Sequence, residues 1–397
     1  MSEWSLPTLT LNPLAAFGIL LIVGVLGGQI ARRVVHLPAI TGYVLAGLII
    51  SPAGLALIDA EMLRSANLFL QLALGLALFE IGRRIDLTWL RRERILLGTV
   101  AIGCLIVFVG VFAVLVALGI PGGAAVLTAS VAMMTSPVVI LEIVRESRAE
   151  GQVTERLMTA TGLGNLFGLV AFGIAISYNH FEAAHGVEES LIGPGWLVLG
   201  SVALGLVSAS VAIRVNQWLG GRERDAQAVL LFGIIALVVG LSALLDFLPP
   251  LALLVLGVGT RQIERGHTVT EPPLAGRSSF FFVAFFVAAG AQLSPGDLRH
   301  FALVATAWLA VRTLSMMVVW WAAARANGLT HRRGAWLGLA LSPLSGGTHS
   351  LALLGATSLP AGSAAFTGLM LAGVFILEIA GPILTRFALQ QAGETPR

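Results

Sequence analysis

The sequence predicts an all-α integral membrane protein of about thirteen transmembrane helices, arranged as inverted repeats with two broken helices that cross. The chain is 57% hydrophobic and only 11% charged, whereas soluble domains carry roughly 25% charged residues. Apolar runs of about 20 residues, the length that spans a bilayer, recur along the whole chain. Two of these runs are interrupted by proline and hydroxyl residues, at 135–137 and at 341–350.

The apolar runs follow one another with short connections, so we expect residues 1–397 to form a single transmembrane domain with no soluble part. A linker around Glu271-Pro272-Pro273 divides it into a first half, about 1–258, and a second half, about 278–390. The thirteen spans are predicted at 14–31, 38–58, 66–82, 96–118, 122–144, 154–177, 193–213, 226–245, 248–263, 278–294, 301–323, 334–356 and 362–387.

The arginines alternate between the two sides of these spans, and the chain has no lysine. Loops after odd-numbered spans are rich in arginine, as at Arg83-Arg84 and Arg332-Arg333, whereas loops after even-numbered spans hold only Arg64 and Arg299. Cytoplasmic loops carry such an excess. We therefore expect a bacterial inner (plasma) membrane, an N-terminus outside and a cytoplasmic C-terminus. The same bias explains the net charge of +3 without a nucleic-acid partner.

Residues suited to enzyme chemistry are scarce. Cys104 is the single cysteine and lies in an apolar run, so it offers no disulfide or cysteine-based metal framework. No nucleophile–base pair or metal-ligand spacing is evident, so we expect neither an enzyme nor a cofactor. The acidic stretch from Tyr178 to Pro194 holds His180 and His185, and a solvated outside loop explains it better than a metal site.

The first interruption, Thr135-Ser136-Pro137, is predicted to form a polar pocket. Pro137 lacks a backbone N–H and disfavours helix at Ser136. Backbone groups freed in hydrocarbon must find partners or line a cavity. The next span carries Thr161 and Asn165, so the break is flanked by hydroxyls and lies beside an amide, which together form a candidate polar pocket in the membrane. A plain proline kink is the alternative.

The second interruption is a poor helix former inside an apolar run. Its key residues are Ser342, Gly346, Gly347 and His349. The two breaks occupy corresponding places in the two halves. This arrangement is typical of transporters built from inverted repeats, whose site lies near the midplane where broken helices meet.

Among the ionisable residues inside predicted spans, where each costs about 2.5–3.5 kcal/mol on insertion scales, three are candidates for the site. Glu80 is either a functional acid or a partner of Arg83 or Arg84. Arg312 is far from both ends of its span, so it needs an acid or the carbonyls of a broken helix. Glu378 is the candidate acid, in a structural, charge-compensating pair with Arg312.

Several stretches resemble one family of transporters over nearly the whole chain. They are Leu37–Leu55, Leu78-Phe79-Glu80-Ile81-Gly82, Thr135-Ser136-Pro137, Phe280–Gly290 and Glu378–Leu389. These stretches are similar to the spans of monovalent cation/proton antiporters, in the Kef-like branch of the sodium–proton exchanger superfamily.

The resemblance implies the sodium/proton antiporter-like fold, a homodimer, and exchange of Na⁺ or K⁺ for H⁺ by alternating access. Asn165 matches the span-6 position at which the family carries its ion-binding Asp, and an amide can bind a cation but cannot carry a proton. Glu80 matches a span-3 acid of some members, and Arg312 matches the basic residue before the second break. We therefore expect a cation between Thr135, Ser136, Thr161 and Asn165, with Glu80 as the titrating acid.

Two other functions are compatible with the sequence. One is transport of a different small solute, for example an anion attracted to Arg312 and to helix N-termini. The other is a non-transporting sensor or scaffold of the same fold, against which the lack of an appended cytoplasmic domain counts. The expected partners are a monovalent cation, protons, the lipid bilayer and a second copy of the chain.

Overall fold

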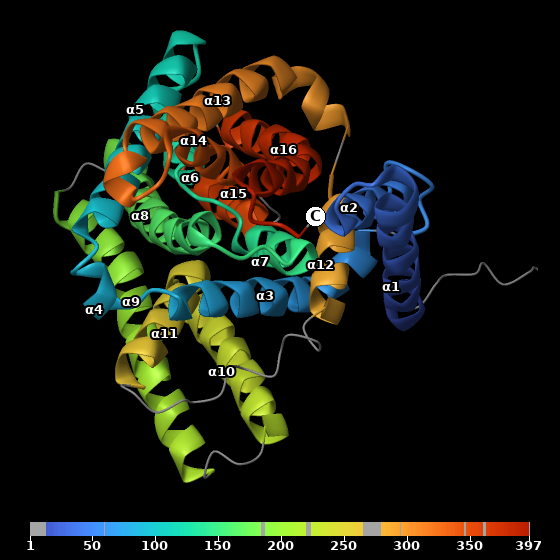
Figure 1. Ribbon diagram of the computed structural model, residues 1–397, viewed down its shortest axis with the longest axis horizontal. Coiled ribbons are helices and arrows are strands. Elements are labelled where there is room, and N and C mark those ends of the chain that lie inside the picture. The colour runs from blue at the N-terminus through green and yellow to red at the C-terminus, as the bar shows by residue number, and fades with distance from the viewer. Residues whose placement is uncertain are drawn as a thin grey trace, which may run out of the picture.

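The computed structural model describes residues 13–58, 60–183, 187–219, 224–264, 279–293, 295–344, 347–359 and 363–396. Throughout these residues the secondary structure is helical, with no β-strand (Figure 1). The α-helices are α1 (Pro13–Ile30), α2 (Ala39–Ile50), α3 (Ala60–Arg83), α4 (Leu87–Leu90), α5 (Arg94–Ala117), α6 (Gly122–Ala132), α7 (Pro137–Ser147), α8 (Gln152–Ala183), α9 (Val187–Trp218), α10 (Arg224–Leu244), α11 (Pro249–Ile263), α12 (Ser279–Ala291), α13 (Pro295–Ala322), α14 (His331–Ala340), α15 (Gly347–Thr357) and α16 (Ser363–Ala392).

The prediction of an all-helical membrane protein is confirmed. Each predicted span contains a helix or, at the two interruptions, a pair of helices. Eight described segments are long and apolar enough to cross a membrane, and α2 and α12 are shorter apolar helices. The helix α2 stops at Ile50 rather than at 58, because Pro52 disfavours helical backbone at Ser51.

One connection differs from the prediction. The acidic stretch expected as a loop from Tyr178 to Pro194 is largely helical, since α8 continues to Ala183 and α9 begins at Val187. His185 and the linker residues 265–277 lie outside the described residues. The described residues contain no cluster of potential metal ligands.

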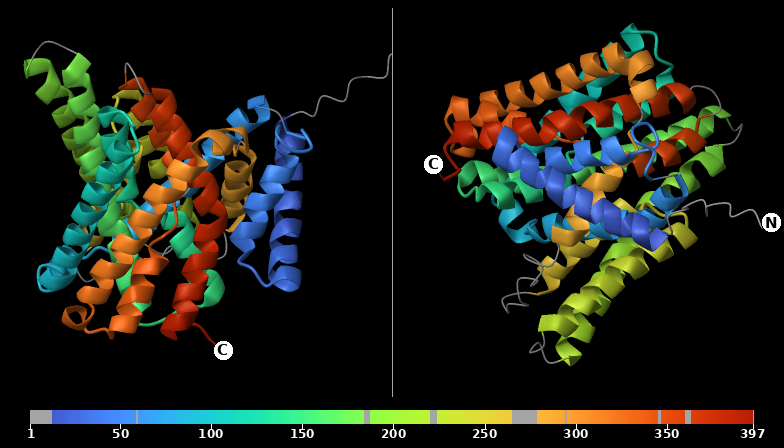
Figure 2. Two further views of the ribbon diagram at one scale, coloured as in Figure 1. Left: turned by 90° about the horizontal axis from the view of Figure 1, so that it is seen from above. Right: turned by 90° about the vertical axis from the view of Figure 1, so that its right-hand side faces the viewer.

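The helices form two bundles that pack against each other (Figures 1 and 2). The panel bundle consists of α1, α2, α3, α9, α10, α11 and α12, and the broken-helix bundle consists of α5, α6, α7, α8, α13, α14, α15 and α16. Glycines permit the closest contacts in the panel bundle. A side chain at Gly82 would meet the backbone of α11, and one at Gly290 would meet the backbone of α2, which is the close packing that small residues allow in membranes.

The broken-helix bundle repeats one order of elements in the two halves of the chain. A long helix, a broken helix and a second long helix follow one another as α5, α6–α7 and α8, and again as α13, α14–α15 and α16. At the first break Pro137 is the first residue of α7, and the Ser136 side chain caps this helix by accepting a hydrogen bond from the Val139 N–H at 3.3 Å. The proline therefore starts a new helix instead of kinking one.

The last described residues fasten α16 to the start of α8. The buried carboxylate of Glu394 accepts hydrogen bonds from the backbone N–H groups of Val153 at 2.7 Å and Thr154 at 2.6 Å, and from the Thr154 hydroxyl at 2.8 Å. A carboxylate is favoured at a helix N-terminus, where unpaired N–H groups carry partial positive charge. The end of the second half thus anchors the helix that carries Asn165.

Replacing Glu394 is expected to destabilise the protein. Glu394→Ala leaves buried N–H groups without acceptors, which costs about 1–3 kcal/mol, and Glu394→Gln should cost less because its amide oxygen can replace part of the acceptor. Thermal unfolding of the purified protein in detergent measures the effect. Glu150→Gln is the matched control, because Glu150 is an exposed acidic residue in the connection just before α8. An unchanged unfolding temperature in Glu394→Ala would contradict this role.

Candidate functional site

The two breaks lie against each other. The Ser136 backbone N–H donates to the Pro343 carbonyl at 2.8 Å, and the Thr135 hydroxyl donates to the Leu341 carbonyl at 3.0 Å. The prediction that the two broken helices cross and meet is therefore confirmed. Backbone groups that lack a partner within one broken helix form hydrogen bonds with the other broken helix.

Arg312 of α13 joins the ends of both broken helices. Its side chain is completely buried, and it donates to the carbonyls of Ala132 at 2.7 Å, Met134 at 2.6 Å, Leu341 at 3.0 Å and Ser342 at 2.7 Å. The first two carbonyls lie at and just after the end of α6, and the other two follow the end of α14. Each helix C-terminus carries roughly half a negative charge, so one guanidinium compensates about two of them.

The sequence left two kinds of partner open for Arg312, namely an acidic side chain or the carbonyls of a broken helix. Within the described residues Arg312 binds carbonyls of the broken helices, and the expected ion pair with Glu378 is not formed. Glu378 is nevertheless completely buried on α16. One turn further on, Gly381 packs on Pro343, and the Thr385 hydroxyl donates to the Ala340 carbonyl at 3.0 Å. The Glu378 stretch thus supports the second break from the side of α16.

Asn165 of α8 binds the first break through its amide nitrogen. Nδ2 donates to the Thr135 carbonyl at 2.6 Å and to the Thr161 carbonyl at 2.8 Å. Two carbonyl acceptors fix which end of the amide is the nitrogen, because an oxygen there would be repelled. The amide oxygen is therefore the Asn165 atom that can face a ligand. An aspartate in the same place would need a proton or a cation between its carboxylate and these carbonyls.

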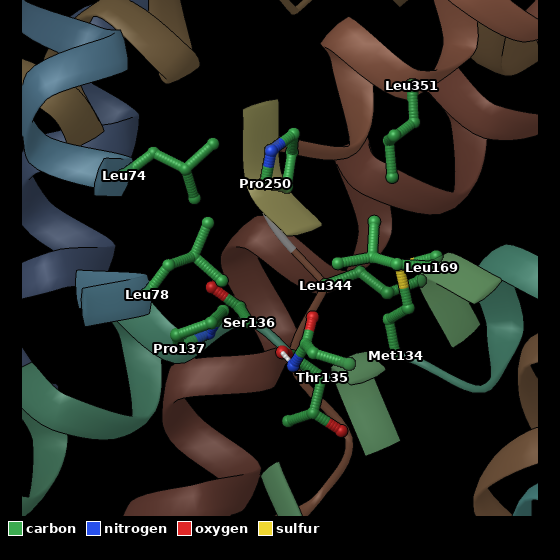
Figure 3. Close-up of a pocket in the computed structure, with 11 residues that line it drawn as sticks. Leu74, Leu78, Met134, Thr135, Ser136, Pro137, Leu169, Pro250, Leu344 and Leu351 are labelled. Atoms are coloured by element: carbon green, nitrogen blue, oxygen red, sulfur yellow. Dashed lines mark hydrogen bonds between the residues drawn. The ribbon is translucent and has the colours of Figure 1, made fainter. Parts of the chain in front are cut away.

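A small cavity lies beside Asn165, between the two bundles (Figure 3). Its volume is about 30 Å³, and a site of about 10–15 Å³ already accepts one water-sized probe. Polar lining atoms come from Thr135, Ser136 and Asn165. The rest of the described wall is apolar, and comprises Met134, Pro137, Leu169, Leu344 and Leu351 of the broken-helix bundle and Leu74, Leu78 and Pro250 of the panel bundle.

Other predicted site residues occupy different positions. Thr161 does not line the cavity, because its hydroxyl donates to the Leu157 carbonyl of its own helix and only its carbonyl reaches Asn165. Ser342 contributes its carbonyl to Arg312. Gly347 begins α15 and His349 lies in its first turn, although the His349 side chain, like the whole of Gly346, falls outside the described residues.

Glu80 is not part of the described cavity wall, contrary to the expectation from the sequence. It forms an ion pair with Arg145 in the last turn of α7, and the two side chains are 23% and 26% exposed. Leu78 faces the cavity, and a residue two positions later on a helix points about 200° away. The alternative pairing of Glu80 with Arg83 or Arg84 is not observed among the described residues either, since Arg83 pairs with Glu264 and Arg84 with Glu155.

One important contact was missed by the sequence analysis. Both carboxylate oxygens of Glu146, in the last turn of α7, accept the Ala39 N–H at the start of α2, at 3.0 and 3.1 Å, and Arg32 lies 3.4 Å from the same carboxylate. The preceding residue, Pro38, makes no side-chain cap for α2. The lack of a local cap indicates that the first N–H groups of α2 need another partner. The spacing of residues in the sequence cannot identify a partner 107 residues away.

Comparison with known proteins gives consistent results. The family model of the transmembrane sodium/hydrogen exchanger matches residues 17–390. Two structures of the sodium proton antiporter MjNhaP1 from Methanocaldococcus jannaschii have a similar fold. One has a TM-score of 0.72 at 17% identity and covers 96% of this chain and 98% of that chain. The other has a TM-score of 0.73 at 18% identity, with 97% and 98% covered. No curated protein sequence matches.

Arg312→Gln is expected to destabilise the fold strongly. Removing one partner from a buried charged arrangement costs about 3–5 kcal/mol, and glutamine offers too few N–H groups for four carbonyls. Arg312→Lys keeps the charge but loses the planar fork, so its loss should be intermediate. Fluorescence-detected size exclusion and thermal unfolding in detergent measure both, with exposed Arg325→Gln as the control. A wild-type unfolding temperature in Arg312→Gln would refute the bracing role.

Proposed function

The chain belongs to the sodium/hydrogen exchanger family, and from that premise we propose that it exchanges a monovalent cation, Na⁺ or K⁺, for protons by alternating access. The family match extends over residues 17–390. The observation that carries the proposal is a polar cavity where two broken helices meet, with one wall from each bundle. A site in this position can be opened to either side by a rigid-body movement of one bundle against the other.

We propose that the cation binds beside Thr135, Ser136 and Asn165. The Asn165 amide oxygen and the two hydroxyls provide neutral oxygen ligands, which can replace part of the hydration shell of a monovalent ion. A cavity of about 30 Å³ favours an ion that has lost most of its water. Because Arg312 is committed to the carbonyls of both helix ends, its charge is compensated away from the cation.

Alternating access is supported by the polar contacts that join the bundles. Glu80 of α3 pairs with Arg145 of α7, and Arg32, which follows α1, pairs with Glu146 of α7. The more exposed Arg84, the residue after α3, lies 3.9 Å from Glu155 of α8. These three cross-bundle ion pairs gather at the end where α3 and α7 finish. We propose that they hold this end closed and separate when the bundles rock. Glu80 then acts in closure rather than as a cation ligand.

The proton needs a carboxyl group, because the Asn165 amide cannot titrate. The described cavity wall contains no carboxylate. We propose that Glu378 carries the proton. It is completely buried, it belongs to the bundle that contains the cation site, and Gly381 in the next turn of α16 packs on Pro343 of the second break. Protonation of Glu378 could therefore be coupled to the position of the broken helices.

The described cavity wall lacks a carboxylate, which favours one alternative function, the transport of an anionic solute. Two observations count against it. Arg312 does not line the described cavity, and its charge is already balanced by four carbonyls. A non-transporting member of the family would have the same fold without flux, so the experiment below distinguishes it as well.

Assembly and orientation belong to the same proposal. We propose a homodimer in a bacterial inner membrane, with the N-terminus outside and the C-terminus in the cytoplasm. The arginines at the ends of α3 and α7, including Arg83, Arg84 and Arg145, support a cytoplasmic location for that face.

Asn165→Leu is expected to reduce exchange at least tenfold, because it removes the amide from the cavity. The assay uses purified protein in liposomes with an internal pH dye and an imposed Na⁺, K⁺ or Li⁺ gradient. Asn165→Asp should strengthen exchange and change its pH dependence, since the new carboxylate faces two carbonyls. Asn216→Leu on α9 is the matched control. A wild-type protein without flux for any cation would reject the proposal, and full activity in Asn165→Leu would reject this site.

Glu378→Gln and Glu80→Gln are expected to differ. A glutamine at 378 cannot take up a proton, so cation-driven pH change should disappear while the protein still folds in detergent. A glutamine at 80 breaks only the pair with Arg145, so proton coupling should persist with a rate altered a few-fold. The reverse outcome, coupling lost in Glu80→Gln and retained in Glu378→Gln, would return the proton to Glu80.

A further inference from the structure

We propose that a groove between α4 and the start of α5 binds an anionic phospholipid. The α4–α5 groove has a volume of about 550 Å³ and is lined by Leu87, Leu90, Arg91, Arg94, Leu97, Gly98 and Ala101. Its floor is apolar and two arginines lie among its lining residues. Sites for small amphipathic ligands typically have about 300–1,000 Å³ and a few placed polar groups on an apolar wall. The groove lies outside the proposed cation site and does not depend on it.

The arginines at this groove are available for an anion. Arg91, Arg92 and Arg94 are all exposed, and none of them pairs with a carboxylate within the described part of the chain. By contrast, Arg83, Arg84 and Arg145 on the same face each have an acidic partner. The Arg94 Nε donates to the Arg91 backbone carbonyl at 3.3 Å, which keeps the Arg94 guanidinium beside the end of α4.

The nearby acids do not cancel this charge. Asp86 accepts hydrogen bonds from the Thr88 and Trp89 N–H groups and caps α4. The hydrogen bond from the Thr88 hydroxyl lowers the pKa of Asp86 below its ordinary value, so the carboxylate stays ionised while Arg261 lies 3.7 Å away. Glu93 is exposed and offsets one of the three arginine charges. The mouth of the groove keeps a net positive charge that complements a phosphate.

The floor of the groove suits an acyl chain. A side-chain carbon added at Gly98 would meet nothing within 4 Å, so the surface above this residue is open. Leu97 and Ala101 continue the apolar strip along α5, and Ile102, Leu105 and Ile106 are exposed further down the same helix. Ala101 is seven positions after Arg94, a rise of about 10 Å along the helix, so a phosphate held by the arginines would place its acyl carbons on the apolar strip.

The geometry favours a lipid over other occupants. Arginine binds phosphate oxygens through two parallel N–H groups, and an apolar floor adds burial of acyl carbon. Free phosphate would use the arginines but leave the floor uncovered. Trp89, which lies between the lining residues Leu87 and Leu90 in the sequence, is 42% exposed, and tryptophans are enriched at the boundary between membrane and water.

Native mass spectrometry and thermal unfolding of the full chain test this proposal with phosphatidylglycerol and phosphatidylcholine of equal chain length. The wild type should retain phosphatidylglycerol at least tenfold better and unfold at a higher temperature in its presence. Arg91→Gln/Arg94→Gln should lose this preference, whereas Arg332→Gln/Arg333→Gln, a pair of exposed arginines outside the groove, should keep it. Equal retention of the two lipids, or a preference that survives in Arg91→Gln/Arg94→Gln, would overturn the proposal.

Gly98→Phe separates a lipid from a simple anion. A Cβ at this position meets nothing within 4 Å, so the fold should persist while binding of long-chain phosphatidylglycerol falls. Inorganic phosphate provides the second arm. A lipid site should show little stabilisation by phosphate at concentrations at which phosphatidylglycerol is effective. If phosphate reproduced the whole effect, or if Gly98→Phe bound long-chain lipid like the wild type, the site would be an anion site and the proposal would be wrong.

Discussion

The position of one guanidinium group inside the bilayer constrains the rest of this structure. Breaking a helix in hydrocarbon leaves carbonyls without partners and a partial negative charge at the broken end. Two such ends, those of α6 and α14, would repel each other where they meet. Arg312 lies between them and donates four hydrogen bonds to their carbonyls. Each interruption would be unfavourable alone. The positive charge of Arg312 stabilises the place where the two interruptions meet.

The crossing in turn determines the properties of the cavity. With Arg312 committed to the helix ends, the remaining polar groups at the break are hydroxyls, a few backbone groups and the Asn165 amide. The amide nitrogen sits where a protonated or cation-bound acid would otherwise meet the carbonyls of Thr135 and Thr161. Asn165 therefore satisfies the break permanently, without a titration step. The proposed proton coupling therefore requires a carboxyl group elsewhere in the broken-helix bundle.

The two bundles are held together by different kinds of contact. Within the panel bundle, glycines such as Gly82 and Gly290 bring backbones close together, which favours a rigid unit. Between the bundles, the described ion pairs join residues at or just after the ends of α1 and α3 to the last turn of α7 and the first turn of α8. At least one partner of each pair is partly exposed to solvent, and ion pairs that are exposed in this way contribute little each, so they can separate without large cost. This difference supports the proposed movement of one bundle against the other around the cavity.

The sequence by itself determined the membrane class, the positions of the spans and the two interruptions, because hydropathy and proline act locally along the chain. It also identified Arg312 and Asn165 as residues that need partners. Tertiary structure alone decided which partners they have. Glu80 was expected beside the cation, yet the rotation of α3 turns Leu78 toward the cavity and Glu80 toward Arg145. Glu146 reaches Ala39 across 107 residues, and Arg312 meets carbonyls of two helices rather than Glu378. These outcomes depend on how helices rotate and cross, and a one-dimensional pattern does not contain that information.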